Sequence, residues 1–410
     1  MEEIVNHLQP LLDKITGYIY PNEIELHWGL LVVIYPYLTG LVAGAFILAS
    51  LVKVFNVKAL QPTYRMSLLT ALAFLLIAPL PLLAHLGHPE RSLEIFLTPN
   101  TSSAMAMFGF VYAWYLMAVL LLEIWFDYRK DMILWARRDR GPMKWLRKLI
   151  SLFSSDISER ALKFDQKALK LITIVGIPSA FLLHGYVGFI FGSVKANPWW
   201  STPLMPVVFL FSAIVSGIAM VMLIYMAVSW LRGKKIDMPC LDTIARYLLY
   251  AFIIDFSLEM LDLIHRMYEA DESFKSLDFM VKTRLFNSQI LVQIIFGTLL
   301  PLGVLALTQV VRLTERARKN AYAIAGVLTL IGIFAMRWNV VIGGQLFSKS
   351  FLGYTVYKMD FATREGMLAA IILMVLPFFI LWGLIRILPP WGEEEVEPAS
   401  TEPGPPSLSS

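Results

Sequence analysis

Cysteine is almost absent from this sequence. Cys240 is the only cysteine among 410 residues, so an internal disulfide, a CxxCH haem attachment and a cysteine-ligated iron–sulfur cluster are excluded. Any metal-based electron carrier that works with this chain must lie on another chain, or be a haem held by histidine alone. His184 with either His85 or His265 could hold such a haem, but a total of six histidines disfavours it.

Charged residues are also scarce. They make up 16% of the sequence, against 57% hydrophobic residues, whereas a soluble domain carries about a quarter charged residues. The apolar residues come in runs of roughly 20 or more, each long enough to cross about 30 Å of hydrocarbon as a helix. Lipid offers no partner for open backbone groups, so these runs must be helical. The sequence therefore predicts an all-α, polytopic membrane protein.

We expect about nine transmembrane helices, nine or ten in all. The expected spans are 28–52, 66–86, 104–126, 168–192, 203–231, 241–265, 285–311, 321–342 and 366–388. In the first of them, Gly40 and Gly44 form a GxxxG pattern, which is typical of close helix packing. Segment 1–27 is expected to be a surface segment rather than a cleavable signal peptide, because no basic region precedes an apolar core. The acidic tail 393–410, rich in proline and serine, is expected to be disordered.

Lysine and arginine gather in alternate loops. The polar loop 127–167 and the turns 53–65, 232–237 and 312–319 hold most of them. Because cytoplasmic loops carry an excess of lysine and arginine, we expect the N-terminus outside and the C-terminal tail in the cytoplasm. Within the long loop, the basic amphipathic stretch 143–153 is expected to lie on anionic lipid headgroups.

A polar group interrupts the apolar pattern where the second expected span ends. It consists of His85, His88, Glu90 and Arg91. Such a group at a membrane edge either anchors a helix end or holds something polar. We expect Glu90 and Arg91 to fix the loop, or a partner above it, through an ion pair.

The sixth expected span carries three acidic residues, Asp255, Glu259 and Asp262. Their spacing by four and three residues places them on one helical face, which His265 extends to the surface. Ionisable residues inside spans are costly and usually mark a pathway or a site. A structural ion-pair stripe, for example with Arg337, is the simpler interpretation. The functional one is a proton-conducting stripe or one side of a quinone pocket, since quinone chemistry needs acids and bases within hydrogen-bond reach.

Polar residues of the other spans leave similar alternatives open. His184 lies in the fourth span, and Arg337 and Asn339 lie near the end of the eighth. An arginine that snorkels to the interface explains Arg337 nearly as well as a site does. Trp199 and Trp200, between the fourth and fifth spans, are most simply part of an interfacial aromatic belt.

Several motifs together resemble one family. LGHPER at 86–91, followed by Asn100 and SSAM at 102–105, is similar to the LGRPER…N…SxM signature of the NrfD/PsrC family. Its members are membrane subunits of quinone-linked redox complexes. The run NPWWSTP at 197–203 and the stretch 337–345, similar to the family's RxNVVIGGQ segment, extend the resemblance in the expected order over most of the chain.

Two positions depart from the family pattern. His88 replaces the usual arginine of the first motif, and Tyr35 stands where some polysulfide-reductase-type members carry a quinone-contacting histidine. The length of the chain and the acidic sixth span most resemble the long DsrP- and HybB-type members. DsrP-like proteins belong to membrane complexes of dissimilatory sulfur metabolism.

The resemblance implies an architecture and a set of partners. We expect two four-helix bundles, in 28–192 and 203–342, with the ninth helix, 366–388, at the periphery. Menaquinone or another quinone would be exchanged, and no haem or iron–sulfur cluster would be bound in this chain. Electrons would pass to or from a ferredoxin-like iron–sulfur subunit docked on the outer face. Further redox subunits, such as cytochromes, would complete the complex.

Our hypothesis is the quinone-binding membrane subunit of a respiratory oxidoreductase, not active alone, in a prokaryotic cytoplasmic membrane. His85, His184 and His265 are the candidate partners of the quinone ring oxygens. The three acidic residues of the sixth span would handle protons. The alternative is a secondary transporter or ion translocator that uses the same acidic stripe. Transporters usually bind near the midplane, whereas the polar clusters here are expected near one face.

Overall fold

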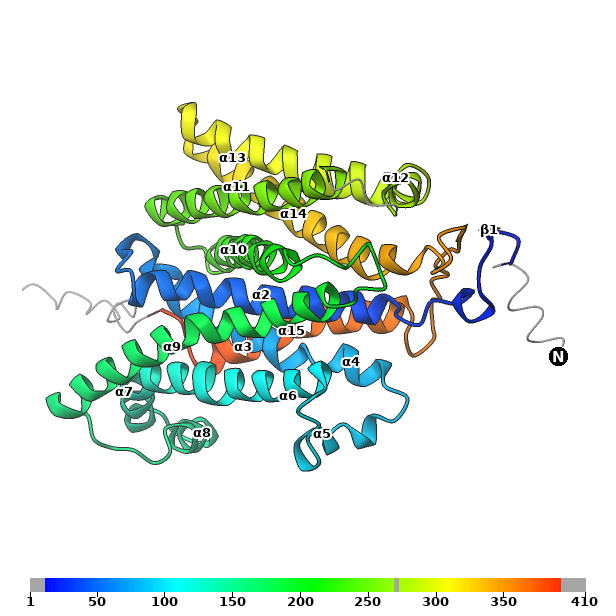
Figure 1. Cartoon of the computed structure of the whole chain (residues 1–410). Helices are drawn as coiled ribbons and strands as arrows, with labels where there is room; N and C mark the ends of the chain where they lie inside the picture. Colours follow the sequence, from blue (N-terminus) through cyan, green and yellow to red (C-terminus); the bar gives the residue numbers. More distant parts are fainter. Residues whose placement is uncertain (1–11, 269–272, 392–410) are drawn as a thin grey trace, which may run out of the picture.

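Long helices make up almost the whole structure (Figure 1). This computed structural model describes residues 12–268 and 273–391. The predicted tail 393–410 and the first eleven residues of the N-terminal segment lie outside the described part of the chain. Within it, the strands are β1 (Thr16–Gly17) and β2 (Gly353–Tyr354), which pair antiparallel and bring the segment before α2 next to the segment after α14.

The helices follow one another with short connections. In the first half they are η1 (Pro21–Glu23), α2 (Leu30–Lys53), η2 (Lys58–Thr63), α3 (Tyr64–Ile77), α4 (Leu80–His85), η3 (Pro89–Arg91), α5 (Glu94–Leu97), α6 (Ala104–Trp114), η4 (Tyr115–Leu121), α7 (Leu122–Arg138), α8 (Pro142–Ile150) and α9 (Glu159–Gly192). In the second half they are α10 (Met205–Leu231), α11 (Met238–Tyr268), α12 (Phe274–Thr283), η5 (Phe286–Leu299), α13 (Leu300–Val310), α14 (Glu315–Val341), η6 (Gly343–Gln345) and α15 (Met367–Ile387).

The predicted class of an all-α, polytopic membrane protein is confirmed. Eight helices of the described residues are long and apolar enough to cross a membrane. They correspond to all the expected spans except the sixth. That span is α11, a helix of 31 residues that carries Asp255, Glu259 and Asp262.

Two helices extend beyond the predicted spans. The third span was expected to end at 126, but the helix continues without a break through η4 and α7 to Arg138. The fourth was expected to begin at 168, but α9 begins at Glu159, where the Ser158 side chain accepts a hydrogen bond from the Ala161 N–H and caps the helix. The predicted polar loop 127–167 is therefore helical at both ends.

Helix α2 lies in the middle of the molecule (Figure 1) and contacts α3, α9, α10 and α14. The predicted close packing of its GxxxG pattern is confirmed. A Cβ atom on Gly44 would lie 2.2 Å from the Ala213 carbonyl oxygen and 2.7 Å from the Gly217 Cα, both on α10. The absence of side chains at Gly44 and Gly217 thus lets the two backbones meet.

The contacts suggest two groups of helices. The first group contains α2, α3, α9 and the continuous helix α6–η4–α7, and the second contains α10, α11, α14 and the continuous helix η5–α13. Helix α15 packs on α3 and α2 at the edge of the first group. The predicted division into two separate bundles stays a prediction, because α2 and α10 pack closely across it.

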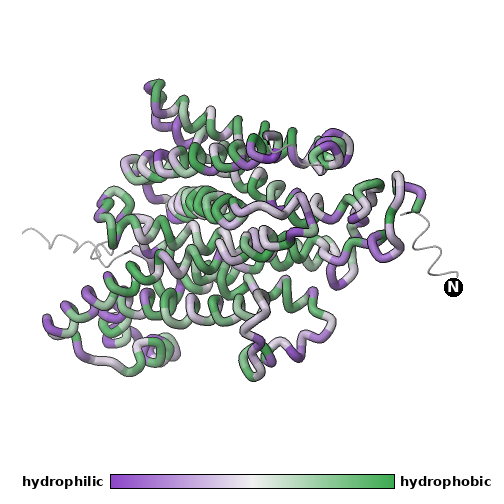
Figure 2. The backbone as a smooth tube through the Cα atoms, in the orientation of Figure 1, coloured by the Kyte–Doolittle hydropathy of each residue, from purple (hydrophilic) through white to green (hydrophobic). Residues whose placement is uncertain are grey.

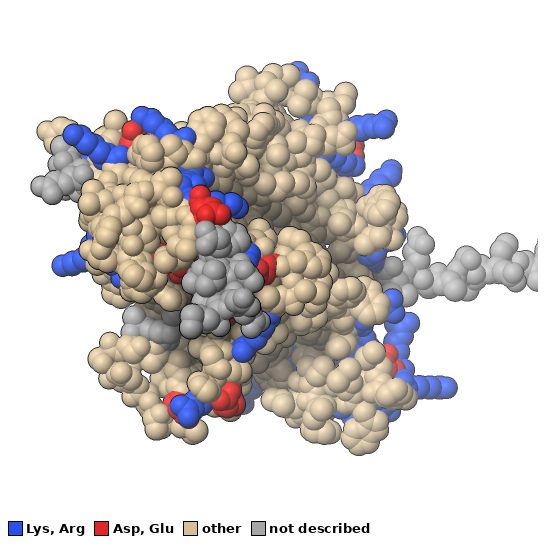
Figure 3. Space-filling view, turned by 90° about the vertical axis from the view of Figure 1, so that its right-hand side faces the viewer, with Lys and Arg blue, Asp and Glu red and all other residues tan. Residues whose placement is uncertain are grey.

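The molecule has two polar ends, which we call the α8 side and the β1 side after the elements they carry (Figure 1). Hydrophilic segments gather at these ends, and the middle is mainly hydrophobic, as Figure 2 shows. The β1 side, seen in Figure 3, is largely uncharged, with lysine and arginine mainly toward its periphery. This distribution suits helices that cross a membrane from end to end.

The predicted amphipathic stretch forms helix α8. Its side chains Trp145 and Leu149, and Phe153 just beyond it, are exposed. Arg147 instead turns inward and forms an ion pair with Asp139. Apolar side chains that face away from the protein suit the predicted position on lipid headgroups.

Candidate functional site

The second group of helices buries an arginine. Arg337, on α14, is 0% exposed. Its Nη2 donates to Ser212 Oγ at 2.7 Å and to the Phe209 carbonyl oxygen at 3.2 Å, both on α10. The guanidinium carbon lies 4.0 Å from the centre of the Phe209 ring. The interpretation of Arg337 as a snorkelling side chain is therefore wrong, because the charge lies inside the protein.

His184, on α9, is the next member of this buried group. It is 0% exposed, and Arg337 Nη2 lies 2.9 Å from its Nε2. A guanidinium can only donate hydrogen bonds, so Nε2 is the unprotonated nitrogen and Nδ1 carries the hydrogen. Nδ1 then donates to Thr39 Oγ1, 3.3 Å away on α2. Both ring nitrogens are engaged, so the haem considered above would have to displace Arg337 or Thr39 from His184.

Two of the three predicted acidic residues face the arginine. The Arg337 side chain interacts electrostatically with Asp255 and Glu259 of α11. Asp255 is 3% exposed, and its Oδ1 has no hydrogen-bond partner among the described residues. Glu259 forms a hydrogen bond with Gln293 of η5, which accepts one from Asn339 Nδ2 at 2.8 Å. We call Arg337, His184, Asp255 and Glu259 the Arg337 cluster.

The third acidic residue, Asp262, belongs to a different set of contacts. Its Oδ1 accepts a hydrogen bond from Thr202 Oγ1 at 2.5 Å, and its Oδ2 pairs with Arg266 at 2.9 Å. Arg266 also donates to the carbonyl oxygen of Pro198. Asp262 therefore ties α11 to the loop that precedes α10, which fits the simpler interpretation of an ion pair with a structural role.

The predicted histidines have separate partners. His85, at the end of α4, is partly buried, and its Nδ1 lies 2.9 Å from Glu365 Oε2. His265 is exposed near the end of α11. His184 is bound to Arg337, as described above. His85 and His184 thus contact different residues and share no hydrogen-bond partner within the described part of the chain.

The other residues of the predicted polar group lie on an exposed loop. His88 Nδ1 lies 2.9 Å from Glu90 Oε1, and both side chains are about two-thirds exposed, at 70% and 66%. Arg91 ends the short helix η3 on the same loop and is exposed. Such a loop is accessible to a partner. Glu90 contacts His88 there rather than the predicted Arg91, and a hydrogen bond between two side chains in water stabilises the fold little.

Two stretches of π-helix accompany buried polar residues. The first is η5, which carries Gln293 beside the Arg337 cluster, and the second is η4, which directly precedes Glu123. Turns of π-helix are frequent at functional sites. Glu123 is 0% exposed, and our sequence reasoning missed it because it lies near the predicted end of a span, beside charged residues. Its i, i+4 spacing from Asp127 was the available signal.

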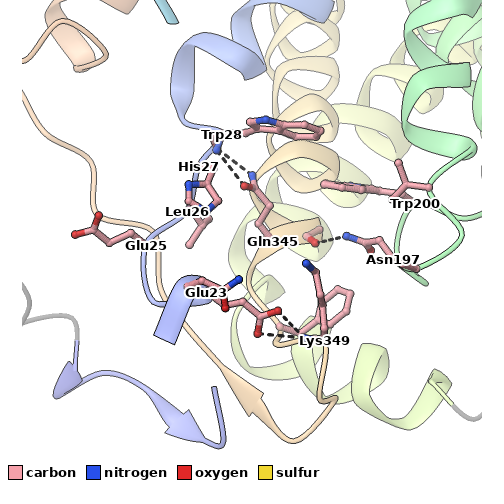
Figure 4. A pocket seen from close by; sticks show the side chains of 14 residues that line it. Glu23, Glu25, Leu26, His27, Trp28, Asn197, Trp200, Gln345 and Lys349 are labelled. Carbon is pink, nitrogen blue, oxygen red and sulfur yellow. Dashed lines mark hydrogen bonds between the residues drawn. The ribbon is translucent and has the colours of Figure 1, made fainter. Parts of the chain in front are cut away.

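A cleft of about 340 Å³ opens on the β1 side (Figure 4). The stacked rings of Trp28 and Trp200, 5.3 Å apart, form part of its wall together with His27. Gln345 bonds both main-chain groups of Trp28, and Lys349 lies opposite these rings. Aromatic and polar side chains thus line the cleft together.

The loop before α10 is fastened to the end of α14. Three of its side chains donate hydrogen bonds to main-chain oxygens there. The pairs are Asn197 Nδ2 with Gly344 O at 2.6 Å, Trp199 Nε1 with Asn339 O at 2.9 Å, and Trp200 Nε1 with Val340 O at 2.6 Å. Two motifs that are far apart in the sequence therefore form one structural unit.

Aromatic rings connect the cleft to the Arg337 cluster. Trp200 lies 5.3 Å from Phe191, centre to centre, and Phe191 lies 5.8 Å from Phe209. Phe209 in turn stacks on His184 at 5.8 Å. A series of packed rings thereby joins the buried cluster to the β1 surface.

Comparison with known proteins identifies the family to which this arrangement belongs. The sequence profile described as "Polysulphide reductase, NrfD" matches residues 21–349. The chain belongs to the NrfD family. The match includes the polar loop after α4, the loop before α10 and the end of α14, so the predicted resemblance is confirmed. The narrower resemblance to DsrP- and HybB-type members stays a prediction.

Relatives of this NrfD-family protein are named as subunits of reductases and of a menaquinol oxidoreductase. It is 30% identical to a selenate reductase subunit of Mesobacillus selenatarsenatis, over 77% of this chain and 73% of the relative. It is 26% identical to a polysulfide reductase chain of Wolinella succinogenes, over 48% and 57%. An Hdr-like menaquinol oxidoreductase integral membrane subunit of Archaeoglobus fulgidus is 21% identical over 88% and 81%. The protein is accordingly an integral membrane subunit of an oxidoreductase complex.

Proposed function

We propose that this NrfD-family subunit exchanges electrons between a membrane quinone and an iron–sulfur partner subunit. The Arg337 cluster supports this most, because ionisable residues buried among membrane helices mark sites of charge or proton movement. One relative is named as a subunit of a menaquinol oxidoreductase and another as a chain of polysulfide reductase. These names favour menaquinone as the quinone and sulfur metabolism as the setting.

Quinone chemistry needs residues that exchange protons. The oxidation of one quinol to a quinone releases two electrons and two protons, and the reduction takes them up. Asp255 and Glu259 of the Arg337 cluster are the carboxylates that we assign to this exchange. Asp262 is the third candidate of the stripe, but it would have to leave Thr202 and Arg266 before it could carry a proton.

The quinone headgroup is assigned to the β1 side, with His85 as its first partner. Glu365 lies at the Nδ1 of His85, so Nε2 is the nitrogen that can reach a ring oxygen. Glu365 orients the imidazole of His85 and stabilises the positive charge that the ring gains when it takes up a proton. His184 takes part only when Arg337 moves away from its Nε2, and His265 is the third candidate.

The partner subunits are assigned because this chain lacks the cysteine ligands of an iron–sulfur cluster. With one cysteine in the sequence, a ferredoxin-like iron–sulfur cluster must be supplied by another chain, which we place on the β1 side next to His88, Glu90 and Arg91. Further redox subunits such as cytochromes would complete the electron route, so this chain is inactive alone. The complex would lie in a prokaryotic cytoplasmic membrane, with the β1 side outside.

Quinone extraction from the purified complex tests this function. We expect bound quinone and quinol-dependent reduction of the iron–sulfur partner. The variant His85→Asn should lower bound quinone and should lower kcat/KM for quinol at least about tenfold, since it removes an acid–base partner. The matched control for quinone binding is His88→Asn, an exposed histidine close by in the sequence, which should leave the amount of bound quinone unchanged.

A wild-type complex without quinone and without quinol-dependent electron transfer would refute the proposal. The acidic stripe of α11 would then favour an ion translocator instead, with Asp255 and Glu259 in the path. Equal losses of bound quinone in His85→Asn and His88→Asn would leave the quinone function standing but would refute the assignment of His85.

A further inference from the structure

Four buried side chains in the first group of helices each have a polar atom without a hydrogen-bond partner among the described residues. They are Glu123 Oε2, Tyr115 OH, Thr70 Oγ1 and Tyr35 OH. Buried polar groups are nearly always bonded either to protein or to ordered water. Four such atoms within one group of helices indicate that water molecules enter it.

These atoms lie at successive depths between the two sides of the protein. Glu123 contacts Tyr64, which begins α3, and is the nearest to the α8 side. Tyr115 lies about two helical turns before Glu123, roughly 12 Å along the axis, and Thr70 lies roughly 9 Å beyond Tyr64. Tyr35 is in the second turn of α2, near the β1 side. The side chains therefore lie at several depths within the first group of helices.

The hydrogen bonds of Glu123 suit a carboxyl group that carries a proton. Tyr64 OH lies 3.3 Å and Thr173 Oγ1 lies 2.9 Å from Glu123 Oε1. Thr173 Oγ1 also lies 2.9 Å from the Leu169 carbonyl oxygen, yet a hydroxyl has one hydrogen to donate. When Thr173 donates to Leu169, only a proton on Glu123 can complete the bond between Glu123 and Thr173.

A ladder of carboxylates joins Glu123 to the α8 side. Asp127 and Asp131 follow it at intervals of four residues, so all three share one face of α7. Exposure rises along the ladder, from 0% for Glu123 to 8% and 18% for the side chains of Asp127 and Asp131. Arg65 pairs with both aspartates, at 2.7 and 2.6 Å, and Lys53 pairs with Asp127 at 3.1 Å.

We propose that Glu123 is a proton-transfer site between water on the α8 side and the interior of the first group of helices. A proton passes from bulk water over Asp131 and Asp127 to Glu123, and leaves it for water that bridges to Tyr115 and onward toward Tyr35. The Glu123 carboxylate is thereby regenerated. This direction applies to quinone reduction, which takes up protons. During quinol oxidation the protons move the opposite way, from the interior over Glu123 to water on the α8 side. This role rests on the proposed quinone function, because quinone turnover supplies the protons or consumes them.

Difference infrared spectroscopy of the intact complex during a pH titration tests the site without any turnover. The wild type should show the carbonyl-stretch band of a buried protonated carboxyl group, which exchanges rapidly in D2O. The band should be lost in Glu123→Gln, which keeps the shape and the hydrogen bonds but cannot release a proton. It should exchange more slowly in Asp127→Asn. An unchanged band in Glu123→Gln would overturn the proposal.

Turnover of the complex in sealed vesicles with a pH-sensitive dye on the α8 side gives the second readout. Glu123→Gln should lower both the turnover and the proton change on that side at least about tenfold, with assembly and bound quinone unaffected. The control Glu159→Gln removes an exposed carboxylate at the same side and should change neither.

Undiminished proton change in an assembled Glu123→Gln complex would overturn the route, while quinol turnover would stand. Absence of quinol turnover in the wild type would instead overturn the quinone function. The infrared band would then still decide whether Glu123 exchanges protons with the α8 side.

Discussion

Replacement of Arg337 by methionine tests the electrostatic core of the site. Methionine keeps an unbranched apolar stem but removes the guanidinium. In the folded protein Asp255 and Glu259 would then face no cation, and His184 and Ser212 would lose their hydrogen-bond donor. We expect an assembled but less stable protein, with little or no quinol-dependent turnover.

The size of the effect follows from burial. Removal of one partner from a directly bonded buried ion pair costs about 3–5 kcal/mol. This range is an upper bound for Arg337, because it interacts with Asp255 electrostatically and makes its hydrogen bonds to other residues. No discount for solvent applies, because Arg337 is 0% and Asp255 is 3% exposed. The carboxylates can limit the loss by binding protons, so we expect a decrease of about 3 kcal/mol in the free energy of unfolding. In a protein that already carries Asp255→Asn, Arg337→Met should lower the free energy of unfolding by less than it does in the wild type. The difference, which is the coupling energy between the two residues, should be about 1–3 kcal/mol.

The assay is a double-mutant cycle in mixed micelles, in which a denaturing detergent unfolds the protein reversibly. The four proteins are the wild type, Arg337→Met, Asp255→Asn and the double variant. Additivity of the two single effects to within about 0.5 kcal/mol would refute the inferred interaction between α14 and α11. As a control, Arg386→Met removes an arginine that lies over the exposed Trp382 ring and should cost less than about 1 kcal/mol.

Two further predictions concern the packing that holds the site. Gly44→Leu should abolish the single sharp peak of the complex in size-exclusion chromatography, because its Cβ would lie 2.2 Å from the Ala213 carbonyl oxygen. The control Gly383→Leu should retain the peak, because a side chain there meets open space. A sharp peak for both variants would contradict the α2–α10 contact. Arg129→Met should destabilise the complex by about 3–5 kcal/mol, which would be measured as a lower Tm. The reason is that Arg129 joins α7 to α9 through hydrogen bonds of 2.8 and 2.5 Å to Asp165. An unchanged Tm would contradict a stabilising role for this ion pair.

Hydropathy alone predicted most of the helices, because a membrane span needs a long apolar run and little else. Close packing at Gly40 and Gly44 was also predictable, since small residues at an interval of four let helices approach. The family followed from motifs in a fixed order. These features are local in the sequence, or are repeated along it.

The Arg337 cluster was not predictable in the same way. The sequence indicates that His184, Asp255 and Arg337 lie within spans, but each lies on a different helix. Which of them meet depends on how α9, α11 and α14 pack around α10. Asp262 illustrates the difficulty, because it shares a helical face with Glu259 in the sequence pattern and yet pairs with Arg266.

Glu123 was missed for a related reason. A span prediction ends where charges begin, so Asp127 marked the end of the third span. In the structure the helix continues because Lys53 and Arg65 from neighbouring segments pair with the charges of α7. Charge next to an apolar run therefore does not end a helix when the neighbouring helices supply the counter-charges.

The bonds between the loop before α10 and the end of α14 have a mechanical consequence. They fix three carbonyl oxygens of α14 and η6 within about two turns of Arg337. A rotation of α14 that swings Arg337 away from His184 must therefore carry the loop and its tryptophans along. Trp200 belongs to the wall of the cleft. A subunit seated in that cleft would therefore restrict the movement of Arg337 without contacting it. Dissociation of that subunit would let Arg337 move away from His184.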